Sequence, residues 1–400
     1  MQTRNKRFSK ACLACSLRFI RRVAPGRSTL LASTPAASAS PERYPIVPRA
    51  TCDASACSQL LSTRVPSRSH NKALIIAAWM GVEHKPRHSP TLLDKMTDRL
   101  QQLTDDFAIP GILAFAEHDG LLRVEVTAPS AAATVHLHGA HITHWQPAGQ
   151  APVLFLSTQS EFADGKPIRG GIPICFPWFG PRSDGQAGPP HGFARIEAWE
   201  LAFAAFLPGS PDAVTLSFVL SPSHLSRSLG FDHFRAEYRV TISTTLTLAL
   251  TVANLAPEPL CFEEALHTYF AVADIRATSI SGLESAPYLD KTDGMQQKIA
   301  PASPLTFTAQ TDSVFPGATG PETIHDPGNR RQIVNTKGNS ATTIVWNPWD
   351  KLASTVADLG AANWQGFCCV ETANARESAI TLNTGETHTM TATFSLIPKP

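Results

Sequence analysis

The stretch Arg169-Gly170-Gly171-Ile172-Pro173-Ile174-Cys175-Phe176-Pro177-Trp178-Phe179-Gly180 is followed by a second motif, His191-Gly192-Phe193-Ala194-Arg195. Glycine and proline are mixed with large apolar residues here. Such a run cannot form a regular helix or a central strand, because proline lacks a ladder donor and glycine raises the entropic cost. The pattern predicts an ordered loop that brings its backbone close to a ligand and points Arg169, His191 and Arg195 inward. From composition alone, a packed loop with surface arginines is an equal alternative.

On both sides of this loop the sequence alternates with a period of two, which is typical of strands with one buried face. The run 246–252, for example, alternates leucine and valine with threonine and alanine. Helical patterns are limited to Leu100–Phe107 and Lys351–Asp358. About twenty short strands without βαβ spacing predict an all-β fold, a large sandwich of mostly antiparallel strands. Clear strand patterns also occupy residues 112–117, 121–127, 134–137, 214–220, 342–346, 366–371, 379–382 and 388–396.

The first 95 residues differ in kind from the rest of the chain. They are rich in Arg, Ser, Ala and Pro and carry 16 Lys and Arg against 4 Asp and Glu. Three interpretations stay open for this leader: a transit peptide, a disordered tail, or translated sequence upstream of a true start at Met96. We therefore expect two parts, a leader of residues 1–95 and a single β-sandwich domain of residues 96–400.

The remaining 305 residues carry 18 basic and 29 acidic side chains, a net charge of about −11 by subtraction from the whole-chain counts. A folded region this acidic, with no basic stripe interleaved with aromatics, is a poor nucleic-acid binder. No apolar run approaches the eighteen or so residues that a membrane-spanning helix needs. We expect a cytoplasmic monomer without nucleic-acid or membrane partners.

Six motifs occur along the chain in a fixed order, and together they resemble those of the hexose-6-phosphate mutarotases, also called glucose-6-phosphate 1-epimerases. The resemblance covers roughly residues 105 to 395, and the proline usual after the glutamate motif is replaced here by Thr372 and Ala373. It implies the galactose-mutarotase-like β-supersandwich, whose concave face holds the sugar. The motifs are Arg169–Pro173, Phe176–Gly180, His191–Arg195, Ala265–Phe270, Val345–Trp349 and Cys369–Thr372.

The resemblance assigns the catalytic pair. Interconverting the anomers of an aldohexose needs a base for the C1 hydroxyl and an acid for the ring oxygen. The family match makes His267 the acid and Glu371 the base, whereas a histidine in this apolar run would otherwise be interpreted as structural. If Glu263 to Tyr269 form one unbroken strand, Glu263 shares a face with His267 but lies about 13 Å away along it. Glu263 is then too distant to be the immediate partner.

The expected substrate ligands are also basic or polar residues of the motifs. Arg169 and Arg195 are candidates for the phosphate and sugar hydroxyls because guanidinium groups bind phosphate oxygens bidentately. His191 is expected to contact the substrate, and Asp312 matches the position of a family aspartate that faces sugar hydroxyls, although Ser313 stands where arginine is common. The resemblance implies no metal or organic cofactor. Four histidines in residues 136–144 suggest a metal site, but on a strand pair they would point to different faces.

The predicted function is that of an isomerase that interconverts the α and β anomers of a hexose 6-phosphate, with D-glucose 6-phosphate as the expected substrate. Two alternatives remain open: an aldose 1-epimerase that acts on unphosphorylated sugar, and a non-catalytic carbohydrate-binding protein of the same fold. A two-carboxylate glycosidase is disfavoured, because the motifs supply one firm catalytic carboxylate.

Overall fold

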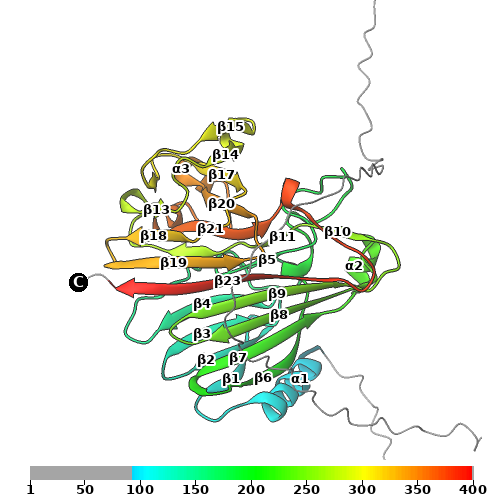
Figure 1. Cartoon of the computed structure of the whole chain (residues 1–400). Coiled ribbons are helices and arrows are strands. Elements are labelled where there is room, and N and C mark those ends of the chain that lie inside the picture. Colours follow the sequence, from blue (N-terminus) through cyan, green and yellow to red (C-terminus); the bar gives the residue numbers. More distant parts are fainter. Residues whose placement is uncertain (1–91, 399–400) are drawn as a thin grey trace, which may run out of the picture. The chain divides into compact units, whose positions relative to one another are not determined.

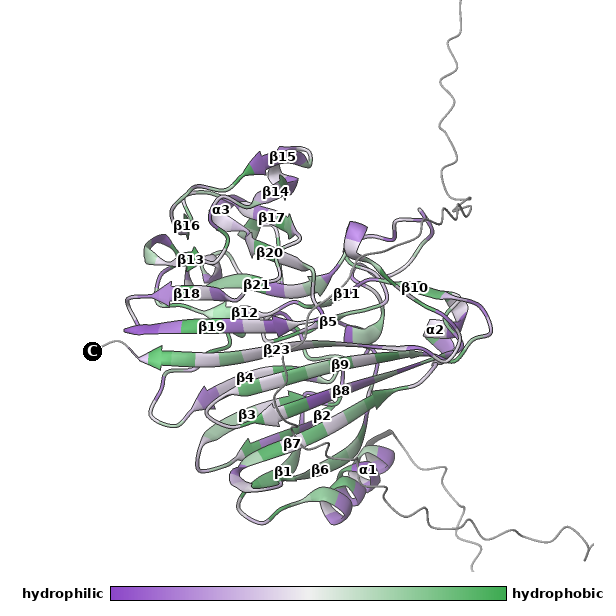
Figure 2. Cartoon of the chain, viewed as in Figure 1, coloured by the Kyte–Doolittle hydropathy of each residue, from purple (hydrophilic) through white to green (hydrophobic). Residues whose placement is uncertain are grey.

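Alternating residues in the sequence become alternating buried and half-exposed positions in the strands. The computed structural model describes residues 92–398, and Figure 1 shows that this part is built mainly from long antiparallel strands. In β9 (Leu246–Asn254), Leu246, Leu248 and Leu250 are fully buried and the residues between them are partly exposed. Figure 2 shows the same alternation as green and purple bands along several strands. The predicted all-β, mostly antiparallel fold is confirmed.

The largest sheet has nine strands, and its order is β16-β13-β18-β19-β23-β9-β8-β7-β6. All of its pairings are antiparallel, so most of it is a meander closed by the C-terminal strand lying between β19 and β9. Its further strands are β6 (Glu200–Leu207), β7 (Ser210–Leu220), β8 (Phe234–Ile242), β13 (Ser279–Ser281), β16 (Leu305–Thr306), β18 (Glu322–Asp326), β19 (Arg331–Gly338) and β23 (Thr387–Pro398).

A four-stranded sheet packs against this large sheet. Its buried residues, such as Val124, Val135 and Trp145, belong to the same apolar cluster as Leu216 and Val240 of the nine-stranded sheet. This shared core makes the two sheets the layers of a sandwich. The four strands, in spatial and sequence order, are β1 (Leu113–His118), β2 (Leu121–Thr127), β3 (Ala131–His136) and β4 (His141–Pro147).

The third sheet carries most of the predicted site residues. Its eight strands follow the order β15-β14-β17-β20-β21-β11-β5, and β12 also pairs with β21. A separate two-stranded ladder joins β10 (Leu260–Phe262) to β22 (Ile380–Leu382). The strands of the third sheet are β5 (Ile174–Cys175), β11 (Glu264–Leu266), β12 (Tyr269–Ala271), β14 (Pro287–Asp290), β15 (Gln296–Ile299), β17 (Thr311–Pro316), β20 (Thr342–Asn347) and β21 (Phe367–Asn374).

Helices are few, as the sequence predicts, but their bounds differ, and α1 with 16 residues is about twice as long as predicted. The predicted helix Leu100–Phe107 is the second half of α1 (Leu92–Phe107), and the one predicted at Lys351–Asp358 is observed as α3 (Trp349–Ala353). A further turn, α2 (His224–Ser228), is capped by Ser223. None of the described helices is long and apolar enough to cross a membrane. The predicted leader lies outside the described residues apart from its last four, which begin α1, so the boundary stays a prediction.

The Gly/Pro stretch is ordered and mostly irregular, as predicted, but it also extends a sheet. Residues Ile174 and Cys175 form β5 against β11, and the amide N–H groups of His267 and Tyr269 continue this register by donating to the carbonyl oxygens of Pro173 and Gly171. A Cβ atom on Gly171 would lie within 3 Å of the backbone of β4. Gly171, at φ 60°, therefore permits close packing of this stretch against the backbone of β4.

A buried arginine connects β12 and the segment after β4 to the nine-stranded sheet. Arg331 of β19 is 1% exposed, its Nε lies 3.1 Å from Asp326 Oδ2, and its other nitrogens donate to three backbone carbonyl groups. Those carbonyls belong to Ala151, Pro152 and Ala271, so one guanidinium joins β19, the segment after β4, and β12.

We expect Arg331→Met to lower the thermal midpoint strongly. Removing one partner of a buried ion pair costs about 3–5 kcal/mol, which corresponds to roughly 10 °C in a domain of this size. The control is Arg330→Met, because the neighbouring arginine is exposed. Calorimetric melting of the three proteins checks this, and equal midpoints for the two variants would contradict it.

Candidate active site

The register of the third sheet sets His267 directly opposite Glu371. Leu266 of β11 pairs with Thr372 of β21, and Tyr269 of β12 pairs with Cys369, so one continuous antiparallel register runs through the gap between β11 and β12. The expected unbroken strand is wrong, since the ladder is interrupted at His267 and Thr268 by a tight turn in which the Thr268 N–H donates to the Leu266 carbonyl. The side chains of opposed residues share a face of the sheet.

The two side chains meet in a nearly dry environment. His267 Nε2 lies 3.3 Å from Glu371 Oε1, and the residues are 8% and 1% exposed. Glu371 Oε2 is buried and has no hydrogen-bond partner among the described residues. On the same face, Cys175, Ala265, Val314, Ile344 and Ala373 form a small apolar cluster beside the carboxylate.

This environment shifts both groups towards their neutral forms. Burial raises the pKa of Glu371 well above its ordinary value, and the nearby Asp312 carboxylate raises it further. Burial lowers the pKa of His267 well below its ordinary value, and the neighbouring His191 and Arg195 act in the same direction. Perturbed groups of this kind gather at sites of proton transfer.

Glu263, in contrast, is engaged elsewhere. Its carboxylate accepts hydrogen bonds from the backbone N–H groups of Phe179 and Arg376. It therefore anchors the Gly/Pro stretch to the turn after β21. The expectation that Glu263 is not the partner of His267 agrees with this geometry, although the strand on which that expectation rested is broken.

Asp312 lies on the same face as the pair, two strands away. It is opposite Trp346 of β20, which in turn is opposite Cys369 of β21. One carboxylate oxygen lies 2.8 Å from Lys291 Nζ, and the other is buried without a partner among the described residues. Burial raises the pKa of Asp312, and the Lys291 ammonium opposes this shift. The unpartnered oxygen is a ready acceptor for a hydroxyl group.

Arg169 comes from the loop beside β5 and is already neutralised. Its guanidinium contacts Asp358 at 3.0 Å and donates to the Tyr269 hydroxyl at 3.2 Å. The Tyr269 ring stacks on His267 with centroids 5.0 Å apart. Arg169 is thus connected to His267 through Tyr269. Asp358 is a site residue that sequence reasoning missed, because nothing in the sequence marks a loop residue 189 positions away as its partner.

Arg195 and His191 also lie near His267. The rings of His191 and His267 meet edge to face at 5.6 Å, and burial lowers the pKa of His191 to about 3, with Arg195 and Lys291 adding to the effect. Arg195 donates to the Pro190 carbonyl, while its Nε is buried without a partner in the part of the chain described. Among residues 92–398, no carboxylate lies within ion-pair distance of Arg195. The six predicted residues thus lie close enough together for their charges to affect one another's pKa values.

The histidines of β3 and β4 are not arranged as metal ligands. His141 Nε2 contacts the Gly170 carbonyl at 2.7 Å, and His138 Nε2 contacts the Lys166 carbonyl at the same distance. These bonds hold the backbone just before and within the Gly/Pro stretch. Across the part of the chain that the structure describes, no three His, Cys, Asp or Glu side chains are grouped to hold a metal ion.

Comparisons with known proteins agree with this geometry. The sequence model of the family described as aldose 1-epimerase matches residues 123–395. A protein of Escherichia coli (strain K12) named "Putative glucose-6-phosphate 1-epimerase" is 33% identical over 272 residues, 68% of this chain and 89% of that protein. The chain belongs to the aldose 1-epimerase family. A protein of the same name from Cenchrus ciliaris is 32% identical and matches 66% of this chain and 82% of its own length.

Solved structures of other proteins have folds similar to that of this chain. The crystal structure of a protein from Salmonella typhimurium, titled a "putative mutarotase", aligns with a TM-score of 0.69 at 28% identity and covers 76% of this chain and all of that one. A galactose mutarotase-like protein from Clostridium acetobutylicum aligns at 0.53 with 11% identity, over 72% of this chain and 98% of its own, and shows the fold alone. Two predictions from the sequence are therefore confirmed for this aldose 1-epimerase family member: the resemblance to the family and the β-supersandwich fold.

The raised pKa of Glu371 makes a prediction about stability. Because the folded-state pKa lies above the unfolded value, the contribution of Glu371 is fully present below the unfolded pKa and is lost as pH rises through the folded pKa. Glu371→Gln should therefore melt on the order of 2 °C or more above the wild type at pH 8. The difference should shrink as the pH falls to 5.

Thermal melting across this pH range tests the point. Glu377→Gln is the matched control, since Glu377 is an exposed glutamate just beyond β21. If the Glu371→Gln variant melts at or below the wild-type midpoint at pH 8, the folded protein favours the ionised carboxylate and the prediction is wrong.

Proposed function

We propose that this protein interconverts the α and β anomers of a hexose 6-phosphate, with D-glucose 6-phosphate as substrate, by acid/base opening of the ring. The observation that carries the proposal is the buried His267–Glu371 pair, 3.3 Å apart and shifted towards the neutral forms of both groups. A small-molecule sugar phosphate is the partner, and the reaction needs no organic cofactor or metal.

The pair supports a balanced proton exchange. The reacting form is the ion pair, which the neutral pair reaches by passing the Glu371 proton to His267 Nε2 across 3.3 Å. Glu371 then takes the proton of the C1 hydroxyl while the bond between C1 and the ring oxygen breaks, and the imidazolium of His267 gives its proton to that oxygen, which restores the neutral pair. Rotation of the open aldehyde and the reverse steps close the ring on the other face of the carbonyl. A raised pKa makes the Glu371 carboxylate a stronger base, and a lowered pKa makes the His267 imidazolium a stronger acid.

Arg195 is the better of the two arginines for the phosphate. Arg169 has its charge offset by Asp358, whereas Arg195 makes its one hydrogen bond within the described residues to a backbone carbonyl and leaves Nε free. A phosphate oxygen would supply the charge partner that this half-buried guanidinium lacks. The names of the relatives from Escherichia coli and Cenchrus ciliaris favour the same class of substrate. Asp312 and His191 are then left for the sugar hydroxyls.

Both members of the pair should be needed for activity. Glu371→Gln and His267→Asn should each lose roughly 10²-fold or more of the enzymatic anomer exchange while still binding the sugar phosphate. NMR exchange spectroscopy between the anomers of glucose 6-phosphate measures this above the spontaneous rate. Glu377→Gln serves as the control, and near wild-type turnover in either site variant would refute the assignment.

The phosphate contact makes a separate prediction. Arg195→Ala should raise KM for glucose 6-phosphate about ten- to a hundredfold, because a charge-assisted hydrogen bond is lost, and should leave the weak activity on free glucose nearly unchanged. Arg169→Ala should affect both sugars, since Arg169 supports the Tyr269 ring that stacks on His267. Arg195→Lys should rescue in part.

The same assay separates the nearest alternative. Arg235→Ala, which changes an arginine on β8, is the control for net charge. If Arg195→Ala lowers activity on glucose and on glucose 6-phosphate equally, then Arg195 organises the ring-binding part of the site. An epimerase of unphosphorylated aldoses would then be favoured.

A further inference from the structure

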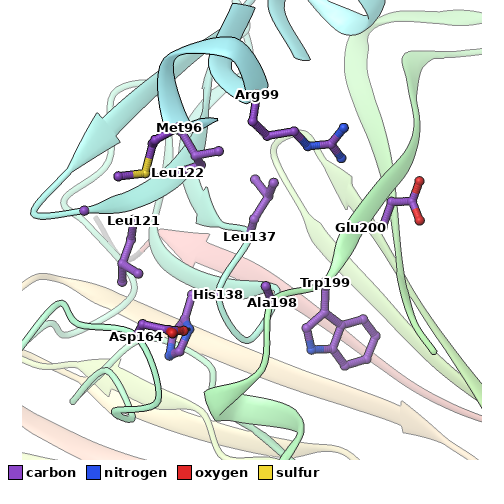
Figure 3. A pocket seen from close by; sticks show the side chains of 11 residues that line it. Met96, Arg99, Leu121, Leu122, Leu137, His138, Asp164, Ala198, Trp199 and Glu200 are labelled. Atoms are coloured by element: carbon purple, nitrogen blue, oxygen red, sulfur yellow. The ribbon is translucent and has the colours of Figure 1, made fainter. Parts of the chain in front are cut away.

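A second cavity lies away from the catalytic pair, under α1. It has a volume of about 620 Å³, and Figure 3 shows side chains converging on it from α1, from the start of β2, and from the start of β6. Much of its wall is apolar and comes from Met96, Leu121, Leu122 and Leu137. Its lining shares no residue with the candidate active site, so binding in this cavity is independent of the proposed function.

One wall of this cavity contains a buried acceptor without a partner. His138 is 3% exposed, and its Nε2 lies 2.7 Å from the carbonyl oxygen of Lys166. Because a carbonyl oxygen can only accept, Nε2 carries the proton, and in the neutral ring Nδ1 is left as an acceptor. Nδ1 is buried and has no hydrogen-bond partner among the described residues.

A carboxylate stands beside this nitrogen. Asp164 Oδ1 lies 4.0 Å from His138 Nδ1, and the Asp164 side chain is 96% exposed at the cavity mouth. Two acceptors at this separation can be bridged by one group with several N–H donors. The other charged residues of the lining, Arg99 and Glu200, have opposite signs and lie on the far side from His138 in Figure 3. The His138 side of the lining therefore has an uncompensated negative charge.

We propose that this cavity is a binding site for a small primary amine with an apolar body. The ammonium group donates to His138 Nδ1 and to Asp164, and the apolar part lies against Leu121, Leu122 and Leu137. Such a ligand would give His138 Nδ1 a hydrogen-bond donor, place a cation beside Asp164 and cover the apolar wall of the cavity. Neither an anion nor a neutral hydrocarbon would meet all three conditions.

The probe is benzylamine, and benzyl alcohol is its uncharged counterpart. Titration of the full chain, followed by NMR shifts of the histidine ring protons and by calorimetry, should give saturable binding of benzylamine and at least tenfold weaker binding of benzyl alcohol. Asp164→Asn should weaken benzylamine binding about tenfold without affecting folding, because the side chain is exposed. Asp212→Asn, at an exposed aspartate outside the lining, should leave binding unchanged.

A filling variant tests the location independently of charge. Leu122→Trp places a larger side chain in the wall and should abolish binding of both probes, while its melting midpoint reports whether the fold is kept. Binding that survives Leu122→Trp in the folded variant, or that is equal for the amine and the alcohol, overturns the proposal. So does the absence of saturable benzylamine binding, or an equal loss of affinity in Asp212→Asn and Asp164→Asn.

Discussion

The antiparallel register between β21 and the segment Glu264–Ala271 is the constraint on which the site depends. It fixes His267 opposite Glu371, and a shift by one residue would turn one of the two side chains to the other face of the sheet. Three features hold this register in place: pairing of β21 with β20 on its other edge, pairing of β11 with β5, and the two N–H groups that bond to the Gly/Pro stretch. The proposed acid and base are therefore positioned by backbone geometry before any side-chain contact is considered.

The reverse face of β21 is held by buried ion pairs. Thr372 contacts Asn335, whose amide donates to Glu322, and Glu322 lies 3.0 Å from Lys337 Nζ. Asn374, also on this face, donates to a second buried carboxylate, Glu264, which pairs with His388. Hydrogen bonds and ion pairs thus fix β21 from behind. Glu371 on the front and Glu264 on the reverse face each keep one buried carboxylate oxygen without a partner among the described residues.

The sequence predicts the strands better than their pairing. A period-two run identifies β9, whose burial alternates because one of its faces is buried. Apolar runs locate β2, β20 and β21, although β20 and β21 are almost wholly buried and do not alternate, and the observed β9 and β21 end two and three residues beyond the predicted runs. Motif resemblance selects six residues that the fold brings into one region, although their roles are tested only by the experiments above. Nothing local encodes the ion pair between Arg169 and Asp358, or the break in the ladder at Thr268, since both depend on segments distant in the chain. The packing role of Gly171 was missed for the same reason.

The location of the residues also explains why the reaction class can be inferred more firmly than the substrate. His267 and Glu371 lie on paired segments of one sheet, whereas Arg195 lies in a short 3₁₀ turn and Arg169 in the loop beside β5. A sheet register is either kept or lost, so the opposed positions of His267 and Glu371, on which the proposed reaction rests, are a property of the whole fold. Loop cations can be gained, lost or neutralised, as Asp358 neutralises Arg169, without disturbing the ladder. The proposed recognition of phosphate is therefore the part of this architecture that can vary most easily, and Arg195, the site arginine without a carboxylate partner among the described residues, is the residue on which that proposal depends.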